Sequence, residues 1–381
     1  MSDVLILGSG LAGYTVAREF RKLAPDASLT LLSADSAAFY SKPMLSNGLA
    51  ANKTAESLAM KSAEQMATEL KAAVRPGSRV EQIDPVRKVV KTASGEYPYG
   101  KLVLALGADP FTPPMQGDAV TEVLTVNDLS DYGRFRAALL GKRSVILLGG
   151  GLIGCEFAND LVTAGFEVTV IDPMQWPLSR LLPQAAGEFM MRQLETAGIT
   201  LRLGEQAAAV NRTAVGYQVT LAGGDVLEAD LVLSAIGLRP RIALAAAAGI
   251  KTARGIVVDR HLQTSDPAIF ALGDCAEVEG LVLPFVLPIM NAARALAPTL
   301  AGTPTPVRYP AMPVVVKTPA CPTVVSPPAI GSAGEWRIEP EDGGIAASFM
   351  SEDGALLGFA LLGTATARKQ ALTGALPPVL A

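Results

Sequence analysis

The sequence is poor in the side chains that bind metals or form disulfide bridges. It contains three cysteines, Cys155, Cys275 and Cys321, and one histidine, His261. The cysteines are far apart, and no CxxC or CxxxxC pair occurs. This odd, scattered set fits a reducing cytosol better than a disulfide framework and leaves few ligands for a zinc or iron–sulfur site. We therefore expect no metal site and a reducing compartment, the cytoplasm.

The sequence also lacks a strong charge bias and a long uninterrupted apolar run. Its 381 residues carry a formal net charge of −4, which argues against a nucleic-acid partner. The most apolar region, residues 281–301, is interrupted by prolines, Asn291 and Arg294, so no membrane span is expected. The apolar start of the chain has no basic segment or cleavage site and is not expected to be a signal peptide.

A strand–turn–helix pattern stands near the start of the chain. The apolar run VLIL leads into Gly8, Gly10 and Gly13, which are spaced as GxGxxG. The first glycine allows a tight turn, the second lets the backbone approach a pyrophosphate, and the third brings helix and strand together. A second apolar strand, 28–32, is followed by Asp35, one or two residues beyond the usual place of a ribose-binding acid.

The same pattern recurs about 140 residues later. After the apolar run SVILL, Gly149, Gly151 and Gly154 repeat the GxGxxG spacing, and the next strand ends at Asp172. An acid there accepts a hydrogen bond from a free ribose 2′-hydroxyl and repels a 2′-phosphate, which favours NADH over NADPH. A single GxGxxG is a weak signal, whereas two complete units predict two nucleotide sites.

Three more segments connect these units. The runs KLVLALGADP and DLVLSAIGLRP each end in a glycine followed by a proline. They are either core strands with turns or the two crossings that bracket an inserted domain. The run AIFALGDCA predicts a strand that enters a helix, with Asp274 either facing a nucleotide or capping that helix.

Taken in order, GSGLAG, LALGADP, GGGLIGCEFA, SAIGLRPR and ALGDCAEV resemble the motifs of the FAD-dependent pyridine nucleotide oxidoreductases. The resemblance spans roughly residues 4–300. It implies an α/β fold with two Rossmann-like nucleotide-binding domains, the NAD domain inserted in a split FAD domain, plus a small α+β C-terminal domain. The expected domains are an FAD-binding domain (1–112 and 240–309), an NAD-binding domain (113–239) and a C-terminal interface or docking domain (310–381), which ends in an apolar helix over 361–372.

Within that family, SKPMLSNGL, LIGCEFANDL, GLRPR and VVVKTPACPTVVSPP look like the rubredoxin–NAD reductases of bacterial alkane-oxidising systems. The resemblance implies the following FAD contacts: Gly8, Ser9, Gly10, Leu11, Ala12, Gly13, Ala34, Asp35, Lys42, Val80, Asp274, Val286 and Lys317. It implies the following NADH contacts: Gly149, Gly151, Leu152, Ile153, Gly154, Glu156, Asp172 and Gly237. Lys42 and Glu156 are the expected catalytic residues, although Lys42 is equally a candidate solvated turn residue and Glu156 a first-turn acid that complements the helix dipole.

Two departures from the family pattern bear on the chemistry. Relatives often have a lysine near flavin N5 where this chain has Asn47, so Lys42 or Lys317 is expected to supply that positive charge. Relatives that reduce disulfides have a cysteine about where this chain has Ser41, and no second thiol lies nearby. The resemblance therefore implies that electrons leave the flavin directly for an outside acceptor.

The function implied by the resemblance is transfer of electrons from NADH through FAD to rubredoxin. Hydride passes to flavin N5, and single electrons then leave for an external iron centre in an alkane-hydroxylase-type or oxidative-stress chain. Rubredoxin is a small acidic protein, so a local basic patch of Lys42, Arg294, Arg308 and Lys317 is the expected docking site on a monomer or homodimer.

Other functions fit the same residues. A ferredoxin reductase of an oxygenase system, or an NADH oxidase with oxygen as acceptor, needs the same two nucleotide sites. A non-catalytic flavin-binding sensor is the alternative from a different class. A membrane quinone reductase is disfavoured, because no basic amphipathic segment is evident.

Overall fold

The first glycine turn follows strand β1 of a seven-stranded sheet. A computed structural model describes residues 2–381, so Met1 of the expected FAD-binding domain lies outside the described residues. The strand order is β3-β2-β1-β6-β5-β4, and β17 pairs with β6 on the side of that path. The strands are β1 (Ser2–Leu7), β2 (Leu29–Leu32), β3 (Ala73–Arg75), β4 (Val80–Asp84), β5 (Val89–Thr92), β6 (Gly95–Leu104) and β17 (Ile269–Ala271).

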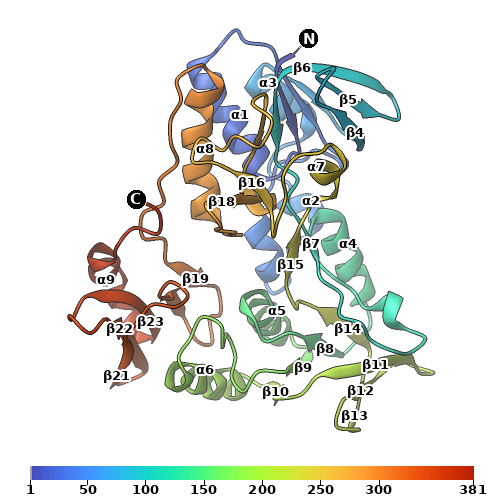
Figure 1. Ribbon diagram of the computed structural model, residues 1–381. Helices are drawn as coiled ribbons and strands as arrows, with labels where there is room; N and C mark the ends of the chain where they lie inside the picture. Colours follow the sequence, from blue (N-terminus) through green and yellow to red (C-terminus); the bar gives the residue numbers. More distant parts are fainter. Residues whose placement is uncertain (1) are drawn as a thin grey trace.

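The long strand β6 joins two parts of this sheet. Its first residues pair antiparallel with β5, and its later residues pair parallel with β1 and β17. The parallel strands are buried on both faces, as β2 shows with four buried residues out of four. Helix α1 (Leu11–Leu23) follows β1 and packs lengthwise along α8 (Val286–Leu300), as Figure 1 shows.

The second glycine turn belongs to a four-stranded parallel sheet with the order β10-β9-β8-β14. Its strands are β8 (Ser144–Leu148), β9 (Glu167–Asp172), β10 (Ile199–Leu203) and β14 (Leu231–Ser234). Its helices are α4 (Leu129–Ala138), α5 (Leu152–Thr163) and α6 (Gln184–Thr196). A three-stranded antiparallel sheet adjoins it, formed by β11 (Ala207–Arg212), β12 (Tyr217–Leu221) and β13 (Val226–Ala229).

The two segments that end in glycine and proline pair with each other. Strands β7 (Ala108–Pro110) and β15 (Leu238–Pro240) form a two-stranded antiparallel ribbon between the two larger sheets. After β15 the chain forms α7 (Ala243–Ala247) and the parallel pair β16 (Ile256–Val258) and β18 (Ala276–Val278) before α8. Within residues 2–381, no helix combines the length and apolarity that a membrane crossing needs.

The C-terminal region is a five-stranded antiparallel sheet with the order β19-β20-β23-β22-β21. Its strands are β19 (Val314–Val316), β20 (Thr323–Ser326), β21 (Glu335–Glu341), β22 (Gly344–Met350) and β23 (Leu356–Gly363). A 3-10 turn, η4 (Thr364–Arg368), and helix α9 (Lys369–Ala375) follow.

The predicted apolar helix over 361–372 is wrong in its first part. Leu361 and Leu362 lie in β23, where they pair with β20 and β22 and are fully buried. A short apolar run is compatible with a strand or a buried helix, and its periodicity does not separate the two. Pairing with two neighbouring strands decides in favour of the strand, and the helix begins only at Lys369.

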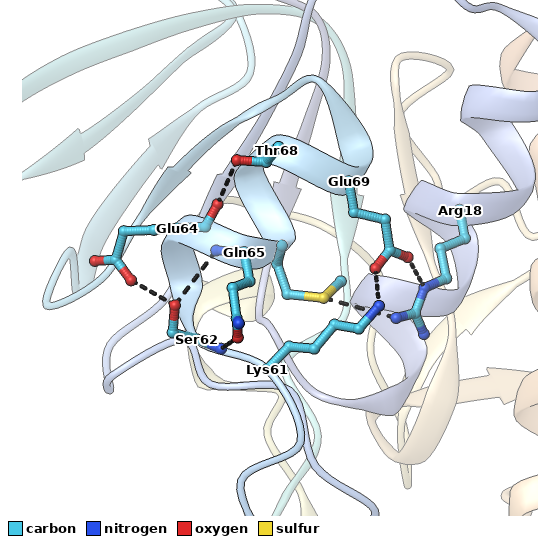
Figure 2. Close-up of polar contacts among 8 residues, drawn as sticks. Arg18, Lys61, Ser62, Glu64, Gln65, Thr68 and Glu69 are labelled. Carbon is cyan, nitrogen blue, oxygen red and sulfur yellow. Dashed lines mark hydrogen bonds and ion pairs between the residues drawn. The ribbon is translucent and has the colours of Figure 1, made fainter.

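The short helix α3 (Ala63–Leu70) is fixed by a cap and an ion-pair cluster. The Ser62 hydroxyl accepts a hydrogen bond from the backbone amide of Gln65, and the Gln65 side-chain oxygen accepts one from the backbone amide of Ser62, which forms a capping box. Figure 2 shows the Glu69 carboxylate between Arg18 of α1 and Lys61; the Arg18 Nε lies 2.6 Å from it. Hydrogen bonds from Arg18 and Lys61 lower the pKa of Glu69 to about 2.

We expect Glu69→Gln to lower the stability of the α1–α3 contact at pH 7 by about 1 kcal/mol or less, because partly exposed ion pairs are screened by water. The folded pKa lies below the unfolded value of 4.5, so the stabilisation is present above pH 5 and is lost as pH falls toward 2. The difference in urea midpoint from the wild type should shrink between pH 7 and pH 4. Glu195→Gln, on exposed α6 surface, is the control, and an equal loss at both pH values would contradict the prediction.

Candidate functional site

The first glycine turn has the shape of a pyrophosphate cradle. A Cβ on Gly8, which has φ +110°, would lie 2.2 Å from the Ala105 carbonyl, and a Cβ on Gly13 would lie 1.9 Å from the Gly8 carbonyl. Both positions therefore need glycine. Around a Cβ on Gly10, in contrast, no atom of the described chain lies within 4 Å. The backbone at Gly10 thus faces open space that a ligand can fill.

The second turn repeats this geometry. A Cβ on Gly149 would lie 2.8 Å from the Ala235 carbonyl, and one on Gly154 would lie 1.8 Å from the Gly149 carbonyl. Gly151 again has no atom of the described chain within 4 Å of a Cβ. The spacing GxGxxG therefore has the same cause in both copies: two close backbone approaches and one open face.

Both helices that follow are open to an anion at their N-termini. The N-cap residues are Gly10 for α1 and Gly151 for α5, and neither makes a side-chain cap hydrogen bond in the part of the chain described. The first-turn amides of a helix have no partner within the helix, and they carry the positive end of its dipole. The predicted contacts in these first turns are Leu11, Ala12, Leu152 and Ile153, and predicted Ser9 directly precedes the N-cap residue of α1.

The two strand-end acids lie beside their glycine turns. Asp35 accepts hydrogen bonds from the Ser33 hydroxyl at 2.5 Å and the Ala37 amide at 2.8 Å, with exposed Ala34 between. The buried Ser9 hydroxyl, 2.6 Å from that of Ser33, also reaches Asp35 at 3.3 Å. These bonds hold the Asp35 carboxylate beside the first cradle, although Asp35 stands one or two residues beyond the usual place of a ribose-binding acid.

Asp172 is held in the corresponding place of the second sheet. Its carboxylate accepts hydrogen bonds from the Gly150 amide at 2.5 Å and from the Met174 amide at 2.8 Å. The side chain stands at the end of β9 and closes the glycine turn from that strand. This arrangement fits a free ribose hydroxyl better than a phosphate.

Lys42 and Asp274 form a second polar group at the edge of the first sheet. The Lys42 ammonium donates to the Asn127 side chain at 2.7 Å, and Asn127 donates to the Ala108 carbonyl at 3.0 Å. Burial lowers the pKa of Lys42, and nearby Asp274 opposes that shift. Burial raises the pKa of Asp274, and Lys42 opposes that shift. A freely solvated turn residue is therefore the wrong description of Lys42.

The segment around Asp274 differs from the expectation. Asp274 lies inside the 3-10 turn η3 (Gly273–Cys275), which leads into β18 and not into a helix. The helix N-cap interpretation is wrong for this reason. A Cβ on Gly273 would lie 2.8 Å from the Ala12 side chain, so the turn packs closely against the first turn of α1.

Glu156 lies at the junction of three parts of the chain. It is 1% exposed on α5, and its carboxylate accepts the Ser46 hydroxyl at 2.5 Å. It also accepts the backbone amide of Lys317 at 2.9 Å and the ammonium of Lys317 at 2.7 Å. Glu156 is the fifth residue of α5 and fully buried, so it is not an exposed first-turn acid.

The positive charge beside Asn47 comes from Lys317. Its ammonium lies 3.1 Å from the Asn47 side-chain oxygen and 3.2 Å from the Ser46 hydroxyl, and it also contacts the Pro43 carbonyl. Lys42 belongs to the same 3-10 turn, η1 (Lys42–Asn47), but its ammonium points to Asn127 instead. Of the two lysines considered from the sequence, Lys317 is the one that reaches Asn47.

Three other predicted residues lie at the ends of elements. Val80 begins β4, and Val286 begins α8 and is 39% exposed. Gly237 has φ +144°, open space around a Cβ, and a carbonyl that accepts the Phe111 amide at 2.9 Å. Ile153 follows the second glycine turn in α5, and the Cα of Ile236 would lie 3.2 Å from a Cβ on Gly149. Both isoleucines are exposed and give the surroundings of that turn apolar surface.

Sequence reasoning missed four residues that complete this arrangement: Ser46, Asn127, Asn159 and Asp160. Asp160 accepts the Leu49 and Ala50 amides at 2.8 and 3.0 Å, and Asn159 accepts the Ala320 amide at 2.9 Å. With Glu156, these two residues form a buried polar stripe at helical spacing on α5. That stripe in an otherwise apolar helix was a readable signal.

The three cysteines are free and buried. Burial raises the pKa of Cys155 above its usual range and raises the pKa of Cys275 and Cys321 to about 11. The thiols are therefore protonated and shielded at neutral pH, which disfavours thiolate chemistry. Ser41, in the place of the missing thiol, is the N-cap residue of η1.

The structure separates the four cations of the expected docking patch into two kinds. Lys42 and Lys317 are bonded inside the site, where their ammonium groups have the partners described above. Arg294 and Arg308 are exposed. The sequence could not separate these two kinds of cation, because the partners of the lysines are distant in the chain.

Comparison with known proteins agrees with this geometry. A family model described as pyridine nucleotide-disulphide oxidoreductase matches residues 2–297, and one described as rubredoxin binding C-terminal domain matches residues 306–376. The chain is 52% identical to the rubredoxin-NAD(+) reductase of Alcanivorax borkumensis over 100% of both chains. It is 47% identical to the enzyme of the same name from Acinetobacter baylyi, over 98% of this chain and 97% of the relative.

A solved structure agrees as well. The covalent complex of putidaredoxin reductase with putidaredoxin superposes with a TM-score of 0.88 at 26% identity, covering 99% of this chain and 94% of that chain. The predicted α/β fold and the resemblance to rubredoxin–NAD reductases are confirmed by these matches. The chain belongs to the pyridine nucleotide-disulphide oxidoreductase family.

Proposed function

We propose that this chain is an NADH-dependent FAD oxidoreductase that delivers electrons to rubredoxin. One observation carries the proposal: the same chain has two open glycine cradles and a C-terminal region that matches the rubredoxin-binding domain. The chain covers the full length of a rubredoxin-NAD(+) reductase at 52% identity, which supports the same pairing of donor and acceptor.

The first cradle suits FAD. The amides of α1 and the open face at Gly10 would hold the pyrophosphate, and Asp35 would bind the adenosine ribose, beside Ala34 and Val80. Asp274 would bond the ribitol chain, and the N-terminus of α8 at Val286 would face the pyrimidine end of the ring. The second cradle suits NADH, with Asp172 on the ribose and Gly237 and Ile153 on its apolar surface.

The domain assignment follows the two crossings. We assign residues 1–112 and 240–309 to the FAD-binding domain, residues 113–239 to the NAD-binding domain, and residues 310–381 to docking. The antiparallel pairing of β7 with β15 supports this division, because the chain leaves and re-enters the first sheet side by side. The separate sheet of the C-terminal region supports the third domain.

FAD, when bound, accepts a hydride from NADH and can pass electrons on one at a time. The residues of this chain position the two nucleotides and supply charge at fixed atoms. Lys317 brings a positive charge into the site, and Glu156 fixes its ammonium at 2.7 Å, so the charge needs no reorganisation during turnover. Lys42, facing Asp274, supplies a second buried cation.

The buried protonated cysteines support direct transfer to the outside acceptor, without a thiol relay. They also support the cytoplasmic location that we propose, because reducing compartments keep thiols free. An alkane-hydroxylase-type or oxidative-stress chain is the proposed destination of the electrons.

Acceptor competition tests the proposed function. The purified protein with retained FAD is mixed with NADH and with rubredoxin, a [2Fe–2S] ferredoxin or oxygen in turn. We expect rubredoxin to give the highest kcat/KM. A higher kcat/KM with ferredoxin or with oxygen would mean that this molecule, and not rubredoxin, is the acceptor. The likeness to putidaredoxin reductase makes ferredoxin the first alternative to test. Failure of NADH to reduce the cofactor anaerobically would favour the sensor alternative and defeat the proposal.

Asp172→Asn is expected to reduce the preference for NADH over NADPH by about 10- to 100-fold. The reason is the loss of a hydrogen bond from the ribose to a charged acceptor, and such a bond contributes ~1.5–3 kcal/mol. Steady-state kcat/KM values for both coenzymes with a small-molecule acceptor measure the ratio. Asp35→Asn is the matched control, because it alters the acid of the other cradle and should weaken FAD retention without changing the ratio. An unaltered ratio in Asp172→Asn would remove Asp172 from coenzyme selection.

Substitutions of Lys317 and Glu156 are expected to shift the two-electron midpoint potential of FAD in opposite directions. Lys317→Met removes a positive charge and should lower the potential by about 30 mV, or ~1.4 kcal/mol for two electrons. Glu156→Gln removes the negative partner and should raise it. Dye-equilibration titration measures both, and Lys317→Arg is the charge-conserving control. Shifts of the same sign in the two variants would indicate structural damage and contradict the electrostatic role.

A further inference from the structure

One long stretch of the chain contains no carboxylate side chain. The whole sequence has 36 Asp and Glu residues, yet none lies between residues 280 and 334. The same stretch contains three cations, Arg294, Arg308 and Lys317. It forms α8, the linker that follows, β19 and β20. A protein with a net charge of −4 therefore has one locally positive segment.

The linker runs back along α8 in the opposite direction. At one end, the Thr305 amide donates to the Thr299 hydroxyl at 3.0 Å. At the other end, the Asn291 side chain lies 3.6 Å from the Met312 sulfur. Figure 1 shows the chain descending beside α8 between these two points. Arg294 on the helix and Arg308 on the linker both lie between the two contacts.

The two arginines have free charges, unlike Lys317. Both are exposed, and within residues 2–381 neither forms an ion pair with a carboxylate. The ammonium of Lys317, in contrast, pairs with Glu156 and donates hydrogen bonds to Ser46 and Asn47. Arg294 and Arg308 are thus available to a negatively charged partner.

Apolar side chains continue this face toward the site. Leu287, one turn before Asn291, is 47% exposed, and Val315, three residues after Met312, is 48% exposed. Val315 stands two residues before Lys317, which enters the site beside Asn47. The face therefore runs from a pair of free arginines to apolar residues at the edge of the cofactor site. Arg308 of the linker and β19 lie within the matched rubredoxin-binding region, residues 306–376.

We infer that rubredoxin docks on this carboxylate-free face, which we define by Leu287, Arg294, Arg308 and Val315. The inference rests on the proposed function and specifies where its acceptor binds. Arg294 and Arg308 attract the acidic partner and raise the association rate, whereas Leu287 and Val315 provide the apolar centre of the contact. A partner held there lies next to the strand that delivers Lys317 to the site.

Charge reversal of the two arginines tests the docking face. For the FAD-loaded enzyme, kcat/KM is measured with rubredoxin and with ferricyanide. Both reactions need hydride uptake from NADH, so the ratio of kcat/KM for rubredoxin to that for ferricyanide reports on docking alone. We expect Arg294→Glu/Arg308→Glu to lower this ratio about 10-fold at low salt and to flatten its dependence on ionic strength. The matched control is Arg337→Glu, an exposed arginine on β21 at the opposite edge of the C-terminal sheet, which should leave the ratio unaltered.

A second pair of variants tests the apolar centre. Leu287→Glu places a negative charge within the face and should also lower the ratio, whereas Val226→Glu, a 49% exposed residue on β13, should not. FAD content from visible absorbance is measured for each variant, and the ratio is calculated per bound FAD.

Several results would overturn the docking face. One is a wild-type-like ratio in both the double arginine variant and Leu287→Glu, and another is an equal loss in the Arg337→Glu control. A change in sedimentation coefficient without a change in the ratio would make the face a contact between two copies of this chain. Wild-type protein that reduces ferricyanide but not rubredoxin would defeat the proposed function itself, a result distinct from these.

Discussion

The buried carboxylate of Glu156 is the interaction on which the arrangement of the site depends. It stands on α5 beside the second nucleotide cradle, and it accepts hydrogen bonds from Ser46 in η1 and from Lys317 after β19. A buried charge is costly unless it is paired and fully hydrogen-bonded. The three segments must therefore meet in one geometry, and Asn159 and Asp160 extend the same junction with bonds to Ala320, Leu49 and Ala50.

The local parts of the fold could be predicted from the sequence because their causes are local. GxGxxG requires glycine where a Cβ would collide with a carbonyl, as at Gly13 and Gly154. The strands before each turn are continuous apolar runs, as a sheet covered on both faces requires. Asp35 and Asp172 follow from the positions at which the next strands end.

The parts that failed depend on contacts between distant segments. Nothing near Lys317 in the sequence indicates that its ammonium meets Glu156, which is 161 residues away. Lys42 and Lys317 therefore resembled Arg294 and Arg308 until the structure separated bonded cations from exposed ones. The residues from Leu361 onward formed an apolar run of uncertain period, and only the pairing of β23 with β20 and β22 decided between strand and helix.

Asn47 stands where the resemblance to the family implies a lysine, and this bears on how the C-terminal region is used. A lysine in η1 would place its cation in the same N-terminal part of the chain as the first cradle. Here the cation beside Asn47 comes from Lys317, two residues after exposed Val315. One short strand, β19, thus connects the proposed docking face with the charge inside the site. Because backbone bonds with β20 hold that strand in register, the position of the docking face and the position of the ammonium are fixed by the same sheet.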